Sequence, residues 1–353
     1  MSENLVKFLK SLLAAPGLSG YEEPVRSLIQ EAWSPLADEI SLSRVGSLHA
    51  LRRGAAPQPR PSILLAAHMD AIGFMVTKIE AGFIRFTEIG GLDPRVLPGQ
   101  PVTVYGREVL AGMIVQPPGR LLPPEARDGT VPMEYLWIDV GLTPAEVSRK
   151  VRVGDVVSYA QAPLDTAGET LCGHTVDNRA SVAVVTHCLE LLQHRPHAWD
   201  VLAVATVQEE ETLLGAFTST YQLRPSLAVA IDVTFASSPG SPAHRTYPLG
   251  KGPTLGWGPN IHPAVFKRFK QVAESLEIPF STEIIPRHSG TDAYGMQIVA
   301  EGIPTMVIGI PLRYMHTPVE MVSIKDIRRA GRLLAECIIQ LEPDFMNTLA
   351  WED

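Results

Sequence analysis

Histidine and acidic residues stand at the ends of apolar segments in five places along the 353-residue sequence. These places hold His68 with Asp70, Asp177, Glu209 with Glu210, Asp232, and His316. In an open α/β sheet the carboxyl ends of the strands converge on one crevice, where ligands bind. The residues can therefore meet despite their wide separation in sequence. Two imidazoles with several carboxylates and no sulfur suit Zn²⁺, Mn²⁺ or Co²⁺.

Taken singly, these residues also have structural interpretations. The alternation of His68-Met-Asp70 puts both side chains on one side of a strand end, where the carboxylate can orient the imidazole, but a strand-end histidine with a capping Asp fits as well. Asp177 can equally be the N-cap of the helix that follows it. A single histidine such as His316 is more often structural than a ligand. Only the combination indicates a metal centre.

The three adjacent glutamates 209–211 are harder to explain without a cation. They follow the apolar segment 201–207, and burying even one carboxylate is costly unless a cation or proton offsets it. A solvated charge run is the usual alternative, but the flanking sequence is apolar on both sides. One carboxylate that bridges two metals about 3.5–4 Å apart would form a centre that polarises a carbonyl and activates a water, with a remaining carboxylate as general base.

Apolar strands and helices alternate around these residues. The expected strands are 62–67, 201–207 and 227–231, and the expected helices are 179–192 and 263–276. Near the N-terminus, Ser19 and Glu22 have the S-x-x-E spacing of a capping box, which predicts the start of a helix. This order of elements predicts an α/β protein.

The middle of the chain has a different pattern. From about residue 73 to residue 161, short alternating segments are separated by glycine-containing turns, which predicts a small all-β body. The simplest architecture is an α/β domain from residues 1–72 plus 162–353, interrupted by a β insert from residues 73–161.

Composition excludes several classes of protein. Lys plus Arg number 30 and Asp plus Glu number 38, so the net charge of −8 argues against a nucleic-acid binder that needs a basic face. No stretch of about 18 residues lacks charges or turn signals, so neither a transmembrane span nor a membrane partner is expected. The three cysteines fit neither a disulfide framework nor a thiolate metal site, and the expected compartment is the cytoplasm.

The sequence resembles the M42 metallo-aminopeptidases, also called glutamyl or deblocking aminopeptidases, over essentially its whole length. The resemblance rests on the segments 15–22 (APGLSGYE), 67–73 (AHMDAIG), 89–91 (IGG), 151–155 (VRVGD), 207–210 (VQEE), 230–234 (AIDVT), 290–293 (GTDA) and 311–320 (PLRYMHTPVE). It implies a mixed-sheet α/β/α metallopeptidase domain with a β insert that mediates dimerisation. It also implies dimers that assemble into a dodecamer enclosing a chamber, short peptides as substrates, and two divalent ions per subunit, Zn²⁺ or Co²⁺ with Mn²⁺ also suitable.

The resemblance further implies a role for each candidate residue. The implied ligands are His68 and Asp232 for one metal, Glu210 and His316 for the other, and Asp177 as the bridge. Glu209 matches the general base, and Asp70 matches the acid that holds His68. We expect Thr291 and Asp292, in the GTDA segment, to line the substrate site, although a loop N-cap role fits them about as well.

Three positions depart from the pattern of the family. Segment 211–214 (ETLL) replaces the usual VGLRG, and Asn178 stands where a second Asp is common. Segment 235–239 (FASSP) lacks the acidic residue often found there. Because such loops can shape the first specificity pocket, the resemblance leaves the preferred N-terminal residue open.

Two other functions also stay open. A deacylase or carboxypeptidase could use the same metals, and it would cleave N-acylated or C-terminal substrates rather than free-amine anilides. A non-catalytic peptide-binding or assembly protein would hold no transition metal. We expect His174, His262 and His288 to be structural or pocket-lining. No partner spacing supports Cys172 as a nucleophile.

Overall fold

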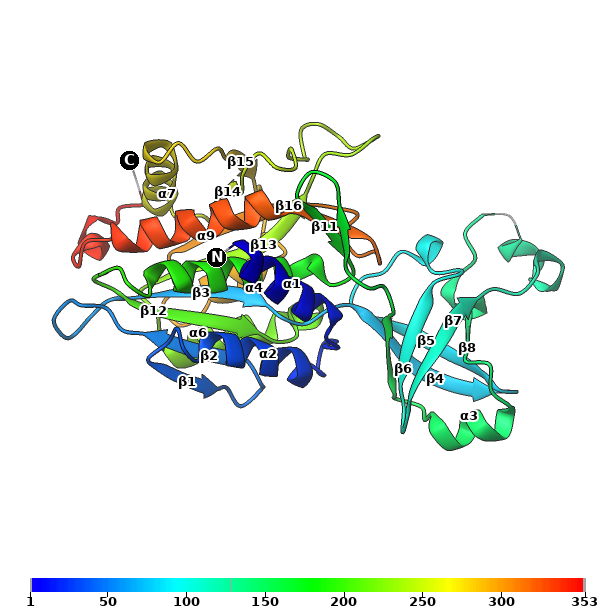
Figure 1. Ribbon diagram of the computed structural model, residues 1–353. Helices are drawn as coiled ribbons and strands as arrows, with labels where there is room; N and C mark the ends of the chain where they lie inside the picture. The colour runs from blue at the N-terminus through cyan, green and yellow to red at the C-terminus, as the bar shows by residue number, and fades with distance from the viewer. Residues whose placement is uncertain (1, 128, 352–353) are drawn as a thin grey trace.

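The computed structural model describes residues 2–127 and 129–351, and Figure 1 shows a layered α/β domain from which a β-barrel projects on one side. Each part has its own apolar core. The larger core includes Leu65, Val204 and Ile308, and the smaller one includes Phe74 and Ile138. The predicted fold, an α/β domain with an all-β insert, is therefore confirmed.

A mixed sheet of eleven strands, counted over the described residues, is the centre of the α/β domain. The strand order is β1-β2-β12-β3-β13-β16-β17-β11-β10, with β14 beside β16 and β15 beside β14. The strands are β1 (Glu39–Leu42), β2 (Leu48–Arg52), β3 (Ser62–His68), β10 (Leu164–Thr166), β11 (Thr170–Gly173), β12 (Asp200–Thr206), β13 (Leu227–Phe235), β14 (Thr254–Trp257), β15 (Ser281–Ile284), β16 (Thr305–Arg313) and β17 (Glu320–Ser323). The neighbouring strands β12, β3, β13 and β16 run parallel, so their carboxyl ends lie at one edge of the sheet.

The central strands are almost continuously apolar because both faces of the sheet are covered. Every residue of β13 except Phe235 is buried. The predicted strand 62–67 lies within β3, which confirms it. The strand predicted at 227–231 continues to Phe235, so Asp232 lies inside β13 rather than after it.

Helices cover both faces of this sheet. Helix α4 packs on β3 and β13 and contacts α1, α2 and α9, whereas α6 and α8 pack together against β12 and β16. None of the helices in the described ranges is long and apolar enough to cross a membrane. The α-helices are α1 (Ser2–Ala14), α2 (Glu23–Trp33), α3 (Pro144–Lys150), α4 (Val176–Leu192), α5 (Glu209–Thr212), α6 (Leu214–Leu223), α7 (Pro263–Ser275), α8 (Asp292–Gln297) and α9 (Ile324–Ile339). Short 3₁₀ turns are η1 (Pro94–Val96), η2 (Gly119–Leu121), η3 (Pro124–Ala126), η4 (Met133–Tyr135) and η5 (Phe345–Thr348).

The inserted body is a closed barrel with the strand order β4-β5-β8-β7-β6-β9. Its strands are β4 (Gly73–Glu80), β5 (Phe83–Ile89), β6 (Pro101–Tyr105), β7 (Val109–Val115), β8 (Trp137–Asp139) and β9 (Val156–Tyr159). The neighbouring strands pair antiparallel, and alternate side chains such as Phe74 and Val76 fill the barrel core. The chain enters the barrel after β3 and leaves it before β10, so the site residues on β3 directly precede the insertion.

The capping box predicted from Ser19 and Glu22 is wrong. Helix α2 begins at Glu23, and the side chain of Glu22, the N-cap residue, makes no capping hydrogen bond. The Ser19 hydroxyl donates instead to Asp70, and Glu22 accepts from the backbone N–H of Gly20. A distant partner therefore binds the Ser19 side chain, and Glu22 bonds the backbone just before it, so the two residues do not cap the helix reciprocally.

Candidate active site

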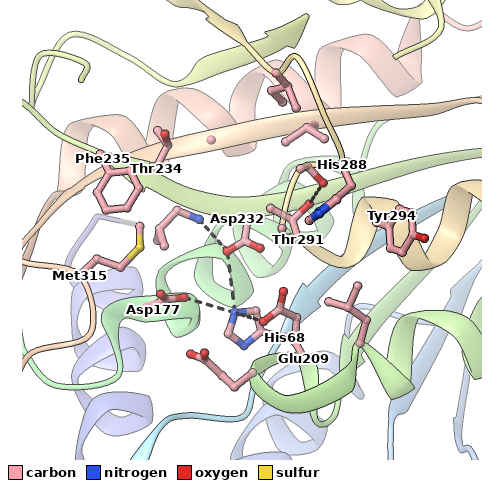
Figure 2. Close-up of a pocket in the computed structure, with 18 of the residues that line it drawn as sticks. His68, Asp177, Glu209, Asp232, Thr234, Phe235, His288, Thr291, Tyr294 and Met315 are labelled. Atoms are coloured by element: carbon pink, nitrogen blue, oxygen red, sulfur yellow. Dashed lines mark hydrogen bonds and ion pairs between the residues drawn. The ribbon is translucent and has the colours of Figure 1, made fainter. Parts of the chain in front are cut away.

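The carboxyl ends of the parallel strands bring the predicted residues together. His68 is the last residue of β3, and Asp232 lies in the neighbouring β13. Glu209 begins α5 directly after β12, and His316 follows β16. Asp177 comes from the first turn of α4. In Figure 2 the labelled carboxylates of this group converge on His68 at one end of a cavity.

Asp177 lies between two histidines. Its Oδ1 atom is 3.2 Å from His68 Nε2, and its Oδ2 atom is 3.4 Å from His316 Nε2. Glu210 Oε2 is also 3.4 Å from His316 Nε2. A carboxylate that bridges two cations would have the same arrangement, with one imidazole near each of its oxygens. The bridging role itself stays a prediction.

Two sets of donor atoms each lie within 4.8 Å of one another and can hold a metal ion. One set is His68, Glu209 and Asp232, and the other is His68, Asp177 and Glu210. His68 Nε2 is 3.8 Å from Asp232 Oδ1 and 3.7 Å from Glu209 Oε2. Distance alone therefore groups Glu209 with the ligands, and its separate role as a base stays a prediction.

Crowding of buried carboxylates disfavours their charged forms. Burial, with the nearby charge of Asp232, raises the pKa of Glu209 to about 10. Burial and the charge of Asp177 also raise the pKa values of Glu210 and Asp232. Glu210 Oε1 is buried and has no hydrogen-bond partner among the described residues. Such a cluster requires protons or cations to offset its charge.

The same negative charges favour the charged form of the histidines. Burial alone would lower the pKa of His68, but the carboxylates of Glu209 and Asp177 raise it well above its usual range. Asp177 is buried too, yet its contacts with His316 and His68 lower its pKa. Charged histidines therefore offset part of the negative charge, and divalent cations would offset more of it.

Asp70 contacts both His68 and the backbone of Glu209 and Glu210. Its Oδ1 atom lies 3.4 Å from His68 Nδ1 and accepts from the Glu209 N–H at 3.0 Å. Its Oδ2 atom accepts from the Glu210 N–H at 3.2 Å and from the Ser19 hydroxyl at 2.5 Å. One fully buried carboxylate thus positions the imidazole and both glutamates, and these contacts fit the role predicted for it.

Two further buried glutamates, Glu320 and Glu22, support the same turns, and neither was predicted from the sequence to do so. Glu320 accepts from the backbone N–H of Asp177 at 3.0 Å and from that of His316 at 2.8 Å. Burial and the charge of Asp177 raise the pKa of Glu320 to about 8. Glu22 accepts from the backbone N–H at the start of α5 at 3.2 Å. The only sequence signal for Glu320 is its position four residues after His316.

A cavity of about 650 Å³ opens beside this cluster. Thr291, His288, Tyr294 and Phe235 are among its walls, as Figure 2 shows. The Thr291 hydroxyl also accepts from the Ala293 N–H at 3.2 Å and so caps α8. Thr291 therefore both caps α8 and lines the cavity, which are the two alternatives expected from the sequence.

Asp292 and two of the unassigned histidines lie away from the cavity surface. The Asp292 carboxylate is buried, accepts from the Thr206 hydroxyl at 2.5 Å, and has a pKa that burial raises to about 6. Whereas His288 lines the cavity, His174 and His262 are not among the described residues that do so.

The positions that depart from the expected pattern lie at the site. Glu211 and Phe235 both line the cavity. Glu211 Oε1 accepts from the Gly90 N–H at 2.7 Å, and Gly90 directly follows β5 of the barrel. The Asn178 side chain points inward and donates to the Ile231 carbonyl at 2.9 Å. These residues therefore shape the surroundings of the predicted ligands without replacing any of them.

Comparison with known proteins agrees with this geometry. The family model described as M42 glutamyl aminopeptidase matches residues 46–333. The lysyl aminopeptidase of Pyrococcus furiosus is 33% identical over 348 residues, which span 96% of this chain and 97% of the relative.

Two solved structures are also similar over nearly the whole chain. The TET aminopeptidase of a Thaumarchaeota archaeon from marine sediment has a TM-score of 0.93 and 30% identity, with 99% of each chain covered. PhTET1-12s, a dodecamer in its crystal, has a TM-score of 0.82 and 26% identity, with 95% of this chain and 99% of that chain covered. Because the family model matches most of the chain and these relatives span nearly all of it, the chain belongs to the M42 glutamyl aminopeptidase family of metalloenzymes.

Proposed function

We propose that the protein is a metal-dependent aminopeptidase that removes N-terminal residues from short peptides. The observation that carries the proposal is the pair of histidines facing the two oxygens of Asp177, with further buried carboxylates around them at one end of a cavity. Membership of the M42 family and similarity to a lysyl aminopeptidase support the same activity.

The donor set fits two divalent cations. We assign His68 and Asp232 to one ion, Glu210 and His316 to the other, and Asp177 to both. The unpartnered Oε1 of Glu210 and the crowding of buried negative charge favour this occupancy. Nitrogen and oxygen donors without sulfur suit Zn²⁺, Co²⁺ or Mn²⁺. When bound, two such ions supply Lewis acidity, which polarises the scissile carbonyl and makes a water more acidic.

Glu209 is the proposed general base. It lines the cavity, and its Oε2 atom lies 3.7 Å from His68 Nε2. Burial and neighbouring carboxylates raise its pKa, and positive charge nearby would bring the pKa back towards neutrality. A carboxylate tuned in this way can accept a proton from the attacking water and then donate it to the leaving amine.

We also propose that subunits associate through the barrel. Val109, Met113 and Leu121 are exposed apolar residues of the insert, and exposed apolar surface is typical of contact regions. The related PhTET1-12s is a dodecamer, and dimers of this chain would assemble in the same way around a chamber that admits short peptides. A monomeric native mass by light scattering would contradict this part of the proposal. The three unpaired cysteines are consistent with the cytoplasm as the proposed compartment.

One experiment separates the candidate functions. Chelator-treated protein is reloaded with Zn²⁺, Co²⁺ or Mn²⁺ and assayed on aminoacyl p-nitroanilides, on their N-acetylated forms and on N-blocked peptides with a free C-terminus. We expect metal-dependent hydrolysis of the free-amine anilides and none after N-acetylation. Cleavage of only the acylated or C-terminal substrates would favour a deacylase or carboxypeptidase. Failure of the untreated protein to hold any transition metal would favour a non-catalytic binding protein.

The names of relatives do not decide which N-terminal residue this chain prefers. The family description refers to glutamyl substrates, whereas the Pyrococcus furiosus relative is a lysyl aminopeptidase. These residues have opposite charges, so the preference has to be derived from the cavity of this chain.

A further inference from the structure

A further, partly buried acid lines the same cavity but does not belong to the predicted metal centre. Glu283 lies on β15, which pairs with β14, which in turn pairs with β16. The order across the sheet is therefore His68 on β3, Asp232 on β13, Gly309 on β16 and then Glu283. The acid reaches the cavity from the side opposite His68.

The hydrogen bonds of Glu283 fix its distance from the metal centre. Glu283 Oε1 accepts from the Thr234 hydroxyl at 2.7 Å, and Oε2 accepts from the Thr254 hydroxyl at 2.6 Å. Thr234 is two residues after Asp232 on the same strand, so both side chains face the same side of the sheet about 7 Å apart. A lysine side chain, with its stem of four carbons, spans a comparable length.

Among the described residues the Glu283 carboxylate has no charged partner that acts on its pKa, although Arg245 and Arg287 line a neighbouring cavity that Glu283 also borders. Burial raises the pKa of Glu283, and the two threonine hydroxyls are the only groups of the described chain that act against this effect. An ionised carboxylate can accept about four hydrogen bonds, so about two acceptor positions are free. A buried carboxylate without a counter-charge is costly, and a cation entering the cavity would offset that cost.

The surroundings leave room for the carboxylate and for an aliphatic stem. A Cβ atom on Gly309 would lie 2.9 Å from Glu283 Oε2 and 2.3 Å from Thr254 Oγ1, so only glycine leaves this space open. Phe235, Ile285 and Val307 add apolar surface to the cavity wall. Long cationic side chains bury their methylene stems on such surface while the charged end reaches a polar partner.

We propose that Glu283 determines substrate specificity and selects peptides whose N-terminal residue is lysine or arginine. The inference rests on the proposed aminopeptidase function, which places the free amine and the scissile bond at the metal centre. An acidic N-terminal residue would bring a second carboxylate against Glu283, and an apolar one would leave Glu283 buried without a counter-charge.

The test compares Glu283→Gln with the wild type on lysyl, arginyl, leucyl and glutamyl p-nitroanilides, using metal-loaded protein. The wild type should show its highest kcat/KM on the lysyl and arginyl substrates. In Glu283→Gln the ratio of kcat/KM for lysyl to leucyl substrate should fall about 100-fold, since one partner of a buried charge pair is lost. The matched control is Glu277→Gln, an exposed glutamate just after α7, which should keep the wild-type ratio.

Other outcomes would overturn the inference in recognisable ways. An unchanged lysyl-to-leucyl ratio in Glu283→Gln, or a wild-type preference for glutamyl or leucyl substrate, contradicts it. If metal-loaded wild type cleaves no free-amine substrate at all, the proposed function fails instead.

A second variant covers the case in which Glu283→Gln does not fold. Thr254→Val keeps the carboxylate but removes the hydroxyl that holds Oε2. It should lower the lysyl-to-leucyl ratio about 10-fold, as expected for loss of a hydrogen bond to a charged group. A ratio equal to that of the wild type would contradict the proposal independently.

Discussion

The two ends of the cavity hold buried carboxylates in contrasting arrangements. At the metal end, defined by the two ligand sets around His68, four carboxylates converge on shared points between two histidines. At the side-chain end, defined by Glu283 with Thr234 and Thr254, a single carboxylate is held by hydroxyl groups. Burial raises the pKa of acids at both ends. The number of converging acids therefore differs with the ligand that we propose for each end. Several acids suit divalent ions at the metal end, and a single acid suits one organic cation at the side-chain end.

Replacing the proposed base should have the largest effect on catalysis at the metal end. We expect Glu209→Gln to lower kcat about 1,000-fold, because the variant cannot accept a proton from water. The metal content, measured by inductively coupled plasma mass spectrometry, should remain two ions per subunit.

The same variant distinguishes a base from a ligand. The distances group Glu209 with His68 and Asp232, so loss of one equivalent of metal in Glu209→Gln would make Glu209 a ligand and contradict the assignment. The control Glu277→Gln should keep both activity and metal.

Asp70→Asn tests whether the metal end depends on the residue behind it. The substitution keeps the shape of the side chain but removes the charge that faces His68 Nδ1. Metal affinity, measured by competition with a chromogenic chelator, should fall about 10- to 100-fold. Asp93→Asn, at a partly exposed acid paired with Arg95 in the insert, is the matched control and should leave the metal affinity unchanged. Equal affinities for Asp70→Asn and wild type would show that these contacts do not orient the ligand.

The pH dependence of stability gives the smallest expected effect. Burial raises the pKa of Glu320 to about 8 and that of Glu209 to about 10, well above the ordinary value of 4.5. The folded chelated protein then binds protons that the unfolded chain has released, so its free energy of unfolding falls as the pH rises. The raised pKa of His68 acts in the same direction. Burial lowers the pKa values of His49 and His174, and these act only below about pH 6.5.

Thermal unfolding at several pH values measures this effect. Between about pH 6.5 and pH 8.5 the Tm of chelated protein should fall by a few degrees. The Tm of metal-loaded protein should change less, because bound cations keep the acids ionised throughout. A chelated protein whose Tm rises over this range would contradict the charge arrangement at the metal end.

The sequence predicted that the residues of the metal end would meet because most of them stand at strand ends, and the structure brings them together, while their separate roles stay predictions. His68, Glu209 and His316 each follow an apolar run, and parallel strands bring such ends to one edge whatever their separation. Asp232 was also identified, although it lies inside β13 rather than after it. The alternation of short segments was enough to predict the all-β insert between the two parts of the α/β domain.

The side-chain end could not be predicted because its chemistry arises from contacts across the sheet. Glu283 lies in a short strand whose four residues alternate between partly and fully exposed, a pattern typical of an ordinary edge. Its partial burial and its threonine partners appear only when β13, β14 and β15 are in place. Ser19 failed as a cap for the same reason, since its partner Asp70 lies 51 residues away.

The contacts of the first 22 residues bear on how the gene can be shortened. The family match begins at residue 46, and a fragment starting there would keep every proposed ligand. It would lose the hydroxyl that holds Asp70 and the carboxylate of Glu22 at the start of α5. It would also lose the carbonyls of Leu12 and Ala15, which accept hydrogen bonds from the buried guanidinium of Arg179. Such a fragment would keep every proposed metal ligand but lose the hydrogen bonds that position Asp70 and the start of α5. The N-terminal segment therefore belongs to the catalytic unit.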